Sequence, residues 1–428
     1  MAPLALLVVG ALSFVLYHYV YDLLADAAGT QRPSEPVNVN DVIKTTVTVL
    51  TLTGAVLAGI YAYRKQLLAE GDAHRADASQ LADRYTTAAE QLGHDQAAVR
   101  LAGVYALARL ADDWEEQRQV CIDVLCAYLR MPYEPDPSEP GHKTGEREVR
   151  RTIVRVIRDH LRTPDTPTSW CACAFDFTGT VFDGGDLSSS TFRGQVGFTG
   201  ARFSGGDFSS STFRSPVDFT GARFSGGEVN FSGVTFSGGP VDFTDATFTG
   251  GEVNFTCAVF TDNWVSFIGA GFSGGEVNFS GVTFGGGPAN YSRATFSGGK
   301  VNFHGTTFSG SEVSFRDATF SGSEVSFRDA TFSGGDVDFI GATFSAGSVY
   351  FGGATLSARM VNFAGATFNG GATFGARPVD FAGATFNGHE VNFGGATFSG
   401  GAPVPICEGA VFTCTHVVWG DVPRPFGL

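Results

Sequence analysis

The sequence contains little charge and, over most of its length, hardly any leucine or lysine. Only 17% of the 428 residues are charged, whereas about 25% is usual for globular proteins. After Ala174 the only leucines are Leu187, Leu356 and Leu428, and Lys300 is the only lysine. The same part holds 39 of the 40 phenylalanines and 48 of the 57 glycines. A single fold therefore cannot cover the chain, and the phenylalanine content argues against ordinary disorder.

Basic residues are too few for direct nucleic-acid binding. The net charge is −15, and residues 165–428 hold 22 acidic against 11 basic side chains. Because a phosphate backbone is bound by clustered Lys and Arg, we expect no direct binding of DNA or RNA. An acidic surface keeps a protein soluble, meets a basic partner or imitates nucleic acid, and we favour the first of these.

Motifs for metal binding and catalysis are also missing. The seven cysteines include no CxxC pair facing another, so no zinc site is predicted, and Cys171 and Cys173 are expected on one face of a strand. Reduced, mostly buried thiols fit a cytosolic location. No HExxH, GxSxG or paired-carboxylate spacing occurs. The Ser-Gly-Gly runs are not predicted to be phosphate-binding loops, because no Lys-Ser or Lys-Thr follows them. Their periodic recurrence indicates corners of the repeat. We therefore expect no enzyme, no metal and no cofactor.

Two long uncharged runs predict a membrane anchor over residues 1–65. The first spans about 3–21 and ends before Asp22, and the second spans about 45–63. Threonines in the second run can hydrogen-bond the helix backbone inside a bilayer. A cleaved signal peptide is the alternative for the first run, but its start lacks Lys and Arg, so we favour a retained span.

The basic residues around the spans predict the orientation. Arg32 and Lys44 lie between the spans, whereas three basic residues follow the second span within twenty positions and Arg84 comes just beyond. The positive-inside rule then places both termini in the cytoplasm of a multi-pass protein of the inner (cytoplasmic) membrane.

Residues 66–163 predict a cytosolic α-helical domain. Good helix formers dominate, and apolar residues recur at three and four positions in helices expected at about 95–110, 114–130 and 146–161. Asp95 is the expected N-cap of the first of these helices. Five prolines and glycines between 132 and 141 predict a loop.

The second half is built from five-residue units. Phe177, Phe182, Leu187 and Phe192 step by five, and the pattern starts again at Phe198. From Phe219 onward the step alternates between five and seven, so that two steps make one period. The block that begins at Phe177 and ends before Phe198 supplies four sides, and so do two of the periods that follow Phe219. Coils of these two kinds can therefore stack with the same cross-section. A four-sided block cannot stack on a single one of the later periods. About ten such coils fit this half.

The run RYTTAAEQLGHDQAAVRLAGVYALARLADD (84–113), followed by VLCAYLRMP (124–132) and EREVRRTIVRVIRDHLR (146–162), resembles a bacterial, actinobacterial-type group of pentapeptide-repeat membrane proteins. The resemblance covers nearly the whole chain. It implies two N-terminal transmembrane helices, a small α-helical domain, and a mainly β, right-handed quadrilateral β-solenoid over 164–413, with 414–428 as a C-terminal cap or tail. It informs architecture far more than activity.

The functional expectation is a non-catalytic, membrane-anchored scaffold whose solenoid binds an unknown protein partner. The lipid bilayer is the second expected partner, and the sequence leaves open whether the protein forms a homo-oligomer. Exposed large residues on a Ser/Thr/Gly surface are the candidate contacts: Trp264 replaces a Glu or Pro, and Tyr350 takes an outward Asn or Asp position. The alternative, implied by the resemblance, is an acidic DNA mimic acting on DNA gyrase or topoisomerase. A third interpretation, an ice-binding threonine face, fits the cytosolic orientation poorly.

Overall fold

A computed structural model describes most of the chain, and the described residues are 2–29, 38–261, 264–322, 324–345, 347–369, 379–399, 408–413 and 416–422. Side chains are described for all of these except residues 2–10, 12, 28–29, 71–78 and 399. Cys407, Cys414 and most of the irregular piece predicted at 369–378 lie outside the described residues. The chain divides into two compact units, Met1–Asp83 and Arg84–Leu428.

The first unit consists of helix α1 (Ala2–Gly29) and most of helix α2 (Val39–Leu92). Among the described residues, one helical stretch, Val39–Glu70, is long and apolar enough by length and composition to cross a membrane. The expected domain boundary at 65/66 falls inside the continuous helix α2. The first expected span, 3–21, is helical, but many of its side chains lie outside the description, so this span stays a prediction.

The second unit begins with a small helical region, in which α3 (Ala97–Asp113), the 3-10 helix η1 (Glu115–Gln117), α4 (Arg118–Arg130) and α5 (Glu146–Leu161) follow the end of α2. The prediction that Asp95 caps α3 is wrong. Gln96 occupies that position without a side-chain cap, and the Asp95 carbonyl instead accepts a hydrogen bond from Arg100 at 2.6 Å. Gly103 lets α3 approach α2, since a Cβ there would lie 2.5 Å from the Leu92 nitrogen.

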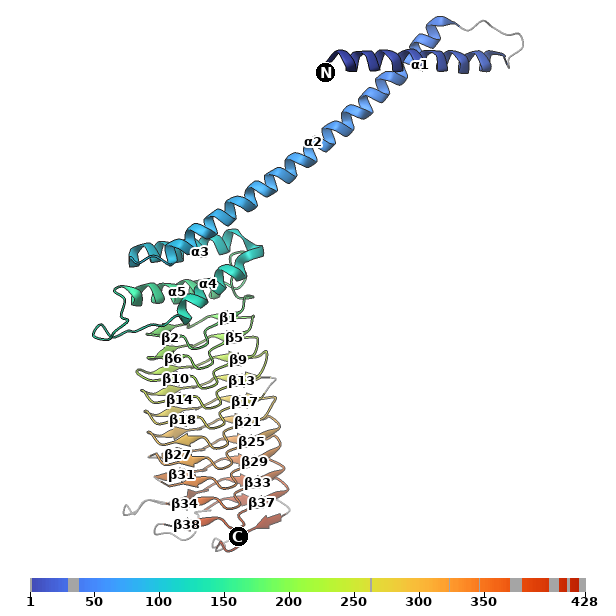
Figure 1. The fold of residues 1–428 in the computed structure, drawn as a ribbon. Coiled ribbons are helices and arrows are strands. Elements are labelled where there is room, and N and C mark those ends of the chain that lie inside the picture. Colours follow the sequence, from blue (N-terminus) through green and yellow to red (C-terminus); the bar gives the residue numbers. More distant parts are fainter. Residues whose placement is uncertain are drawn as a thin grey trace. The chain divides into compact units, whose positions relative to one another are not determined.

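In the described part of the chain, forty short strands follow, and they form four parallel sheets (Figure 1). The β1 sheet contains β1 (Phe175–Asp176), β5 (Val196–Gly197), β9 (Val217–Asp218), β13 (Val241–Asp242), β17 (Val265–Ser266), β21 (Ala289–Asn290), β25 (Glu312–Ser314), β29 (Asp336–Asp338), β33 (Met360–Asn362), β37 (Glu390–Asn392) and β40 (His416–Val418). The β2 sheet contains β2 (Val181–Phe182), β6 (Arg202–Phe203), β10 (Arg223–Phe224), β14 (Thr247–Phe248), β18 (Gly271–Phe272), β22 (Thr295–Phe296), β26 (Thr319–Phe320), β30 (Thr343–Phe344), β34 (Thr367–Asn369) and β38 (Thr397–Ser399).

The other two sheets complete the four sides. The β3 sheet contains β3 (Gly185–Asp186), β7 (Gly206–Asp207), β11 (Val229–Asn230), β15 (Val253–Asn254), β19 (Val277–Asn278), β23 (Val301–Asn302), β27 (Glu324–Ser326), β31 (Ser348–Tyr350) and β35 (Val379–Asp380). The β4 sheet contains β4 (Thr191–Phe192), β8 (Thr212–Phe213), β12 (Thr235–Phe236), β16 (Val259–Thr261), β20 (Thr283–Gly285), β24 (Thr307–Phe308), β28 (Thr331–Phe332), β32 (Thr355–Leu356), β36 (Thr385–Phe386) and β39 (Val411–Phe412).

From β1 to β38, each strand in sequence joins the next sheet, so the chain winds around four sides and returns to the first. The strand register gives the coil length directly. Phe182 pairs with Phe203, which is the spacing of one early block, whereas Val241 pairs with Val265, which is the spacing of two later periods. The predicted β-solenoid with these two kinds of coil is therefore confirmed, with about nine complete turns.

Phenylalanine ladders fill the interior. Phe248 and Phe272, for example, stack with ring centroids 4.7 Å apart and planes 1° from parallel, which matches the spacing of paired strands. Rings from neighbouring ladders meet edge to face, as Phe243 and Phe255 do. The Ser-Gly-Gly corners need glycine because the previous coil is so close: a Cβ on Gly238 would lie 1.9 Å from the Arg214 carbonyl oxygen.

Each end of the solenoid is covered by other parts of the chain. Helices α4 and α5 contact the first coil, through β1 and β3 respectively (Figure 1). The fully buried Trp170 donates a hydrogen bond to Asp112 at 3.1 Å and stacks on His160. At the far end, Trp419 stacks on Phe393. Cys171 and Cys173 lie in a turn, so the strand predicted there is wrong.

Candidate interaction surface

The exposed Trp264 belongs to an apolar corner of the solenoid. It directly precedes β17, and it is 41% exposed. Pro240 and Pro288 directly precede β13 and β21, the strands on either side of β17 in the β1 sheet. The register therefore stacks Pro240, Trp264 and Pro288 in consecutive coils. We call this row the Trp264 corner.

A row of glutamates occupies a corresponding position in the β3 sheet. Glu228, Glu252 and Glu276 directly precede β11, β15 and β19, which pair in register. Partial burial, and then the charges of Glu276 and Glu228, raise the pKa of Glu252 above its ordinary value. The coil thus places an acidic row and the Trp264 corner in different sheets, although the two sets of residues alternate along the sequence.

Tyr350 lies in the β3 sheet, as the last residue of β31, where it pairs with Ser326 and Asp380 in the neighbouring coils. The Arg328 guanidinium lies 4.0 Å from the centre of its ring, so one face of the ring already has a cationic partner. Trp264 is in a different sheet and three coils earlier, since β17, β21, β25 and β29 follow one another. The structure therefore does not bring Trp264 and Tyr350 into one site.

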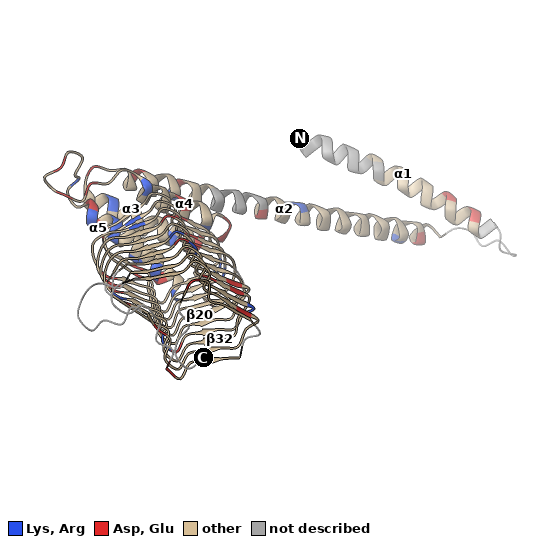
Figure 2. Ribbon diagram, turned by 90° about the horizontal axis from the view of Figure 1, so that it is seen from below, with Lys and Arg blue, Asp and Glu red and all other residues tan. Residues whose placement is uncertain are grey.

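Ion pairs neutralise several acidic side chains along the solenoid. Arg316 contacts Asp338 at 2.7 Å, Arg359 pairs with Asp336, and Lys300 lies 3.9 Å from Glu324. Figure 2 shows both signs of charge along the coils. Along the described coils, cations therefore interrupt the acidic side chains.

An arginine–aspartate junction between α5 and the first coil was not predicted from the sequence. Arg147 donates a hydrogen bond to Asp183 at 2.9 Å, and Arg158 pairs with Asp186. Although partial burial opposes ionisation, hydrogen bonds from Ser188 and Arg158 lower the pKa of Asp186. The spacing of arginines on one face of α5 was the available signal, but their partners depend on the fold.

The described thiols and carboxylates do not assemble a reactive centre. Burial raises the pKa of Cys121 to about 11 and that of Cys126 to about 12, so both thiols are protonated at neutral pH. Within the described ranges, no group of three or more His, Cys, Asp or Glu side chains is arranged to hold a metal ion.

A four-sided parallel coil with five-residue steps and a polar outer surface defines a solenoid-type repeat protein. Residues 198–247 and 291–343 match the family described as Pentapeptide repeats (9 copies). These two stretches therefore carry pentapeptide repeats, as the residue pattern predicted. A search of curated proteins found no match to the chain. The bacterial, actinobacterial-type origin implied by the resemblance stays a prediction.

Proposed function

We propose that the chain is a non-catalytic, membrane-anchored scaffold whose solenoid binds a partner protein at the Trp264 corner. The observation that carries the proposal is the exposed indole between two prolines on a regular, rigid coil. Tryptophan is the residue type most enriched among energetic anchors of interfaces, and proline has little conformational freedom to lose on binding. Tyr350, already stacked under Arg328, is the secondary candidate contact.

The side chains of α2 support the membrane part of the proposal. Leu52, Val56 and Leu57 are 60–61% exposed, an arrangement that is unfavourable in water and favourable in lipid. The two tyrosines near the end of the run, Tyr61 and Tyr63, are also exposed and suit the interfacial belt.

The threonines of α2 also fit a bilayer. The Thr48 hydroxyl donates to the Lys44 carbonyl at 2.8 Å, and the Thr51 hydroxyl donates to the Val47 carbonyl at 2.7 Å. Thr45 and Thr53 make the same bond to the carbonyl four positions earlier. These hydroxyls therefore need no water, which is the condition for a polar side chain in hydrocarbon.

The proposed topology has two spans, with both termini in the cytoplasm. The exposed Cys257 of the solenoid is a native reporter, whereas Cys121, Cys126 and Cys171 are buried. A membrane-impermeant maleimide should leave Cys257 unlabelled in intact cells and label it after permeabilisation. Cys257→Ser is the control for background labelling. Labelling of Cys257 in intact cells would reverse the orientation.

The anchor is tested separately by replacing Val56 with lysine. A lysine at the centre of a span costs about 2.5–3.5 kcal/mol of insertion free energy, so the variant should shift toward the soluble fraction. Tyr105→Lys, at an exposed position of α3, is the matched control and should remain with the membrane. Equal membrane retention of the wild type and both variants would argue against insertion through α2.

The partner is sought by affinity isolation of the full-length protein from membranes, followed by mass spectrometry. The scaffold proposal expects a protein that is recovered with the wild type and lost with Trp264→Ser. The glutamate row is the observation that favours DNA mimicry as the second candidate. That candidate expects gyrase or topoisomerase to be recovered instead and to be released as the salt concentration rises, because exposed charges are then screened.

A further inference from the structure

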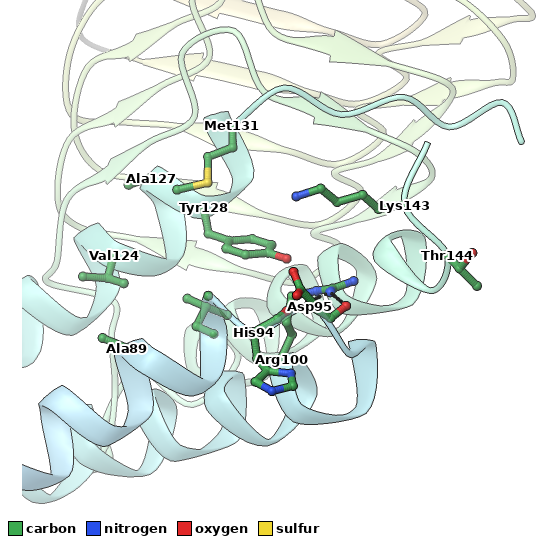
Figure 3. Close-up of a pocket in the computed structure, with 12 residues that line it drawn as sticks. Ala89, His94, Asp95, Arg100, Val124, Ala127, Tyr128, Met131, Lys143 and Thr144 are labelled. Carbon is green, nitrogen blue, oxygen red and sulfur yellow. Dashed lines mark hydrogen bonds between the residues drawn. The ribbon is translucent and has the colours of Figure 1, made fainter. Parts of the chain in front are cut away.

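A cavity of about 610 Å³ lies in the helical region of the second unit (Figure 3). The end of α2, helix α4 and the loop before α5 form its walls. Val124 and Ala127 of α4, Met131 directly after α4, and Ala89 of α2 supply an apolar side. The Met131 side chain is 56% exposed, so solvent reaches this apolar wall. A cavity of this size accommodates a small organic molecule.

Beneath the apolar side, two buried arginines share one buried glutamate. Arg100 Nη2 lies 3.2 Å from Glu146 Oε2, and Arg150 Nε donates to Glu146 Oε1 at 3.1 Å. All three residues are at most 6% exposed. The Tyr128 hydroxyl also donates to Glu146, at 2.8 Å. Arg100 lines the cavity, and its Nε has no hydrogen-bond partner among the described residues. The group thus carries one unmatched positive charge next to the cavity.

A second cation lies at the cavity mouth. Figure 3 shows the Lys143 side chain extending from its loop toward the side where Tyr128 and Met131 lie. No ion pair to Lys143 is found in the described part of the chain. The only carboxylate in the cavity lining, as far as the described residues show, belongs to the exposed Asp95. Positive charge therefore exceeds negative charge around an apolar cavity.

We propose that this cavity binds a small amphipathic monocarboxylate. Its apolar body lies against Ala127 and Met131, and its carboxylate lies near Lys143 in the positive field of Arg100. A cationic ligand is disfavoured by both side chains, and a neutral one leaves Lys143 without a counter-charge. A polyphosphate is also disfavoured, because the lining formed by described residues holds a single exposed ammonium and no glycine-rich loop.

The test uses the full-length protein in nanodiscs of zwitterionic lipid and the water-soluble probe 3-phenylpropanoate, with empty nanodiscs as the blank. Calorimetric titration should show saturable binding. The dissociation constant should rise at least threefold for Lys143→Gln and at least tenfold for Lys143→Glu, because a favourable charge is removed and then reversed. Lys300→Gln, which removes the only lysine of the solenoid half, should leave binding unchanged.

Two further measurements test the charge preference and the shape of the cavity. The cation 3-phenylpropylammonium should bind the wild type at least tenfold more weakly than the carboxylate, and Lys143→Glu should reduce or reverse that preference. Ala127→Leu, which adds volume to the cavity wall, should weaken carboxylate binding while the thermal transition stays intact. Absence of saturable binding, equal affinity for the two probes, or no response to Lys143→Glu in a folded protein would overturn the proposal.

Discussion

Tyr291 stacks on Phe267 inside the solenoid, with ring centroids 4.8 Å apart and planes 3° from parallel. Its ring continues the phenylalanine ladder, but its hydroxyl is completely buried and has no hydrogen-bond partner among the described residues. Burial raises the pKa of this hydroxyl well above its ordinary value. A polar atom without a partner in an aromatic core reduces the stability of the fold.

Replacing Tyr291 with phenylalanine should therefore stabilise the protein. The expected gain in the free energy of unfolding is about 1–3 kcal/mol, the usual cost of a buried unsatisfied polar group. Chemical denaturation followed by circular dichroism measures it. Tyr350→Phe, at the outer surface, should change stability little. A lower denaturation midpoint for Tyr291→Phe would show that the hydroxyl has a stabilising partner.

Deleting a ring from the middle of a ladder should be costly. Phe279→Ala should reduce the free energy of unfolding by about 3–5 kcal/mol, because it leaves a cavity between Phe255 and Phe303. Phe412→Ala should cost less, because this ring ends a ladder and is only half-buried. Equal effects of the two substitutions would contradict a stack stabilised by neighbouring coils.

The junction between α5 and the solenoid should weaken in acid. The pKa of Asp186 is lowered in the folded state. Its ionised form therefore contributes stability above the pKa of the unfolded state, which is near 4. This contribution is lost as the pH falls through the pKa of the folded state. Hydrogen exchange should show falling protection of α5 amides from pH 6 to pH 3. Asp186→Asn should lower protection already at pH 6, whereas Asp329→Asn, in a distant coil, should not.

The glutamate row should have the opposite pH dependence. The pKa of Glu252 is raised in the folded state. Ionisation of this carboxyl therefore lowers the stability of the protein as the pH rises through the folded-state pKa. Glu252→Gln should stabilise the protein slightly at pH 7, because solvent screens this exposed row, and the gain should vanish below about pH 4, where the carboxyl is protonated in both the folded and the unfolded state. Glu324→Gln, which removes a partner of Lys300, should give no gain.

The coil could be predicted from sequence because five-residue steps fix the side on which every residue lies. The restart of the five-residue pattern at Phe198 already predicted coils that stack, and the structure stacks Phe182 on Phe203. The Tyr350–Arg328 contact could not be predicted in the same way, since it depends on the side-chain conformation within the register.

The helical region was harder to predict because its contacts are not periodic. Asp95 was a plausible N-cap by residue type, yet its carbonyl binds Arg100 and Gln96 takes the cap position. The pairing of Arg100 with Glu146 requires α3 and α5 to meet, and no local pattern encodes that meeting, whereas Arg150 and Glu146 lie four positions apart on α5. The strand β40 likewise extends the β1 sheet into residues expected to form the tail.

The central claim is that a local aromatic contact on the solenoid, and not its negative charge, binds the partner. The most direct measurement is the affinity of the full-length protein for the isolated partner from about 0.1 to 1 M salt, in which the screening length falls from about 10 Å to about 3 Å. Trp264→Ser should weaken binding at least tenfold. The triple change of Glu228, Glu252 and Glu276 to Gln should alter it less than threefold, with little salt dependence. Binding that collapses with salt and depends on the glutamates, or salt-sensitive inhibition of gyrase, would contradict the account.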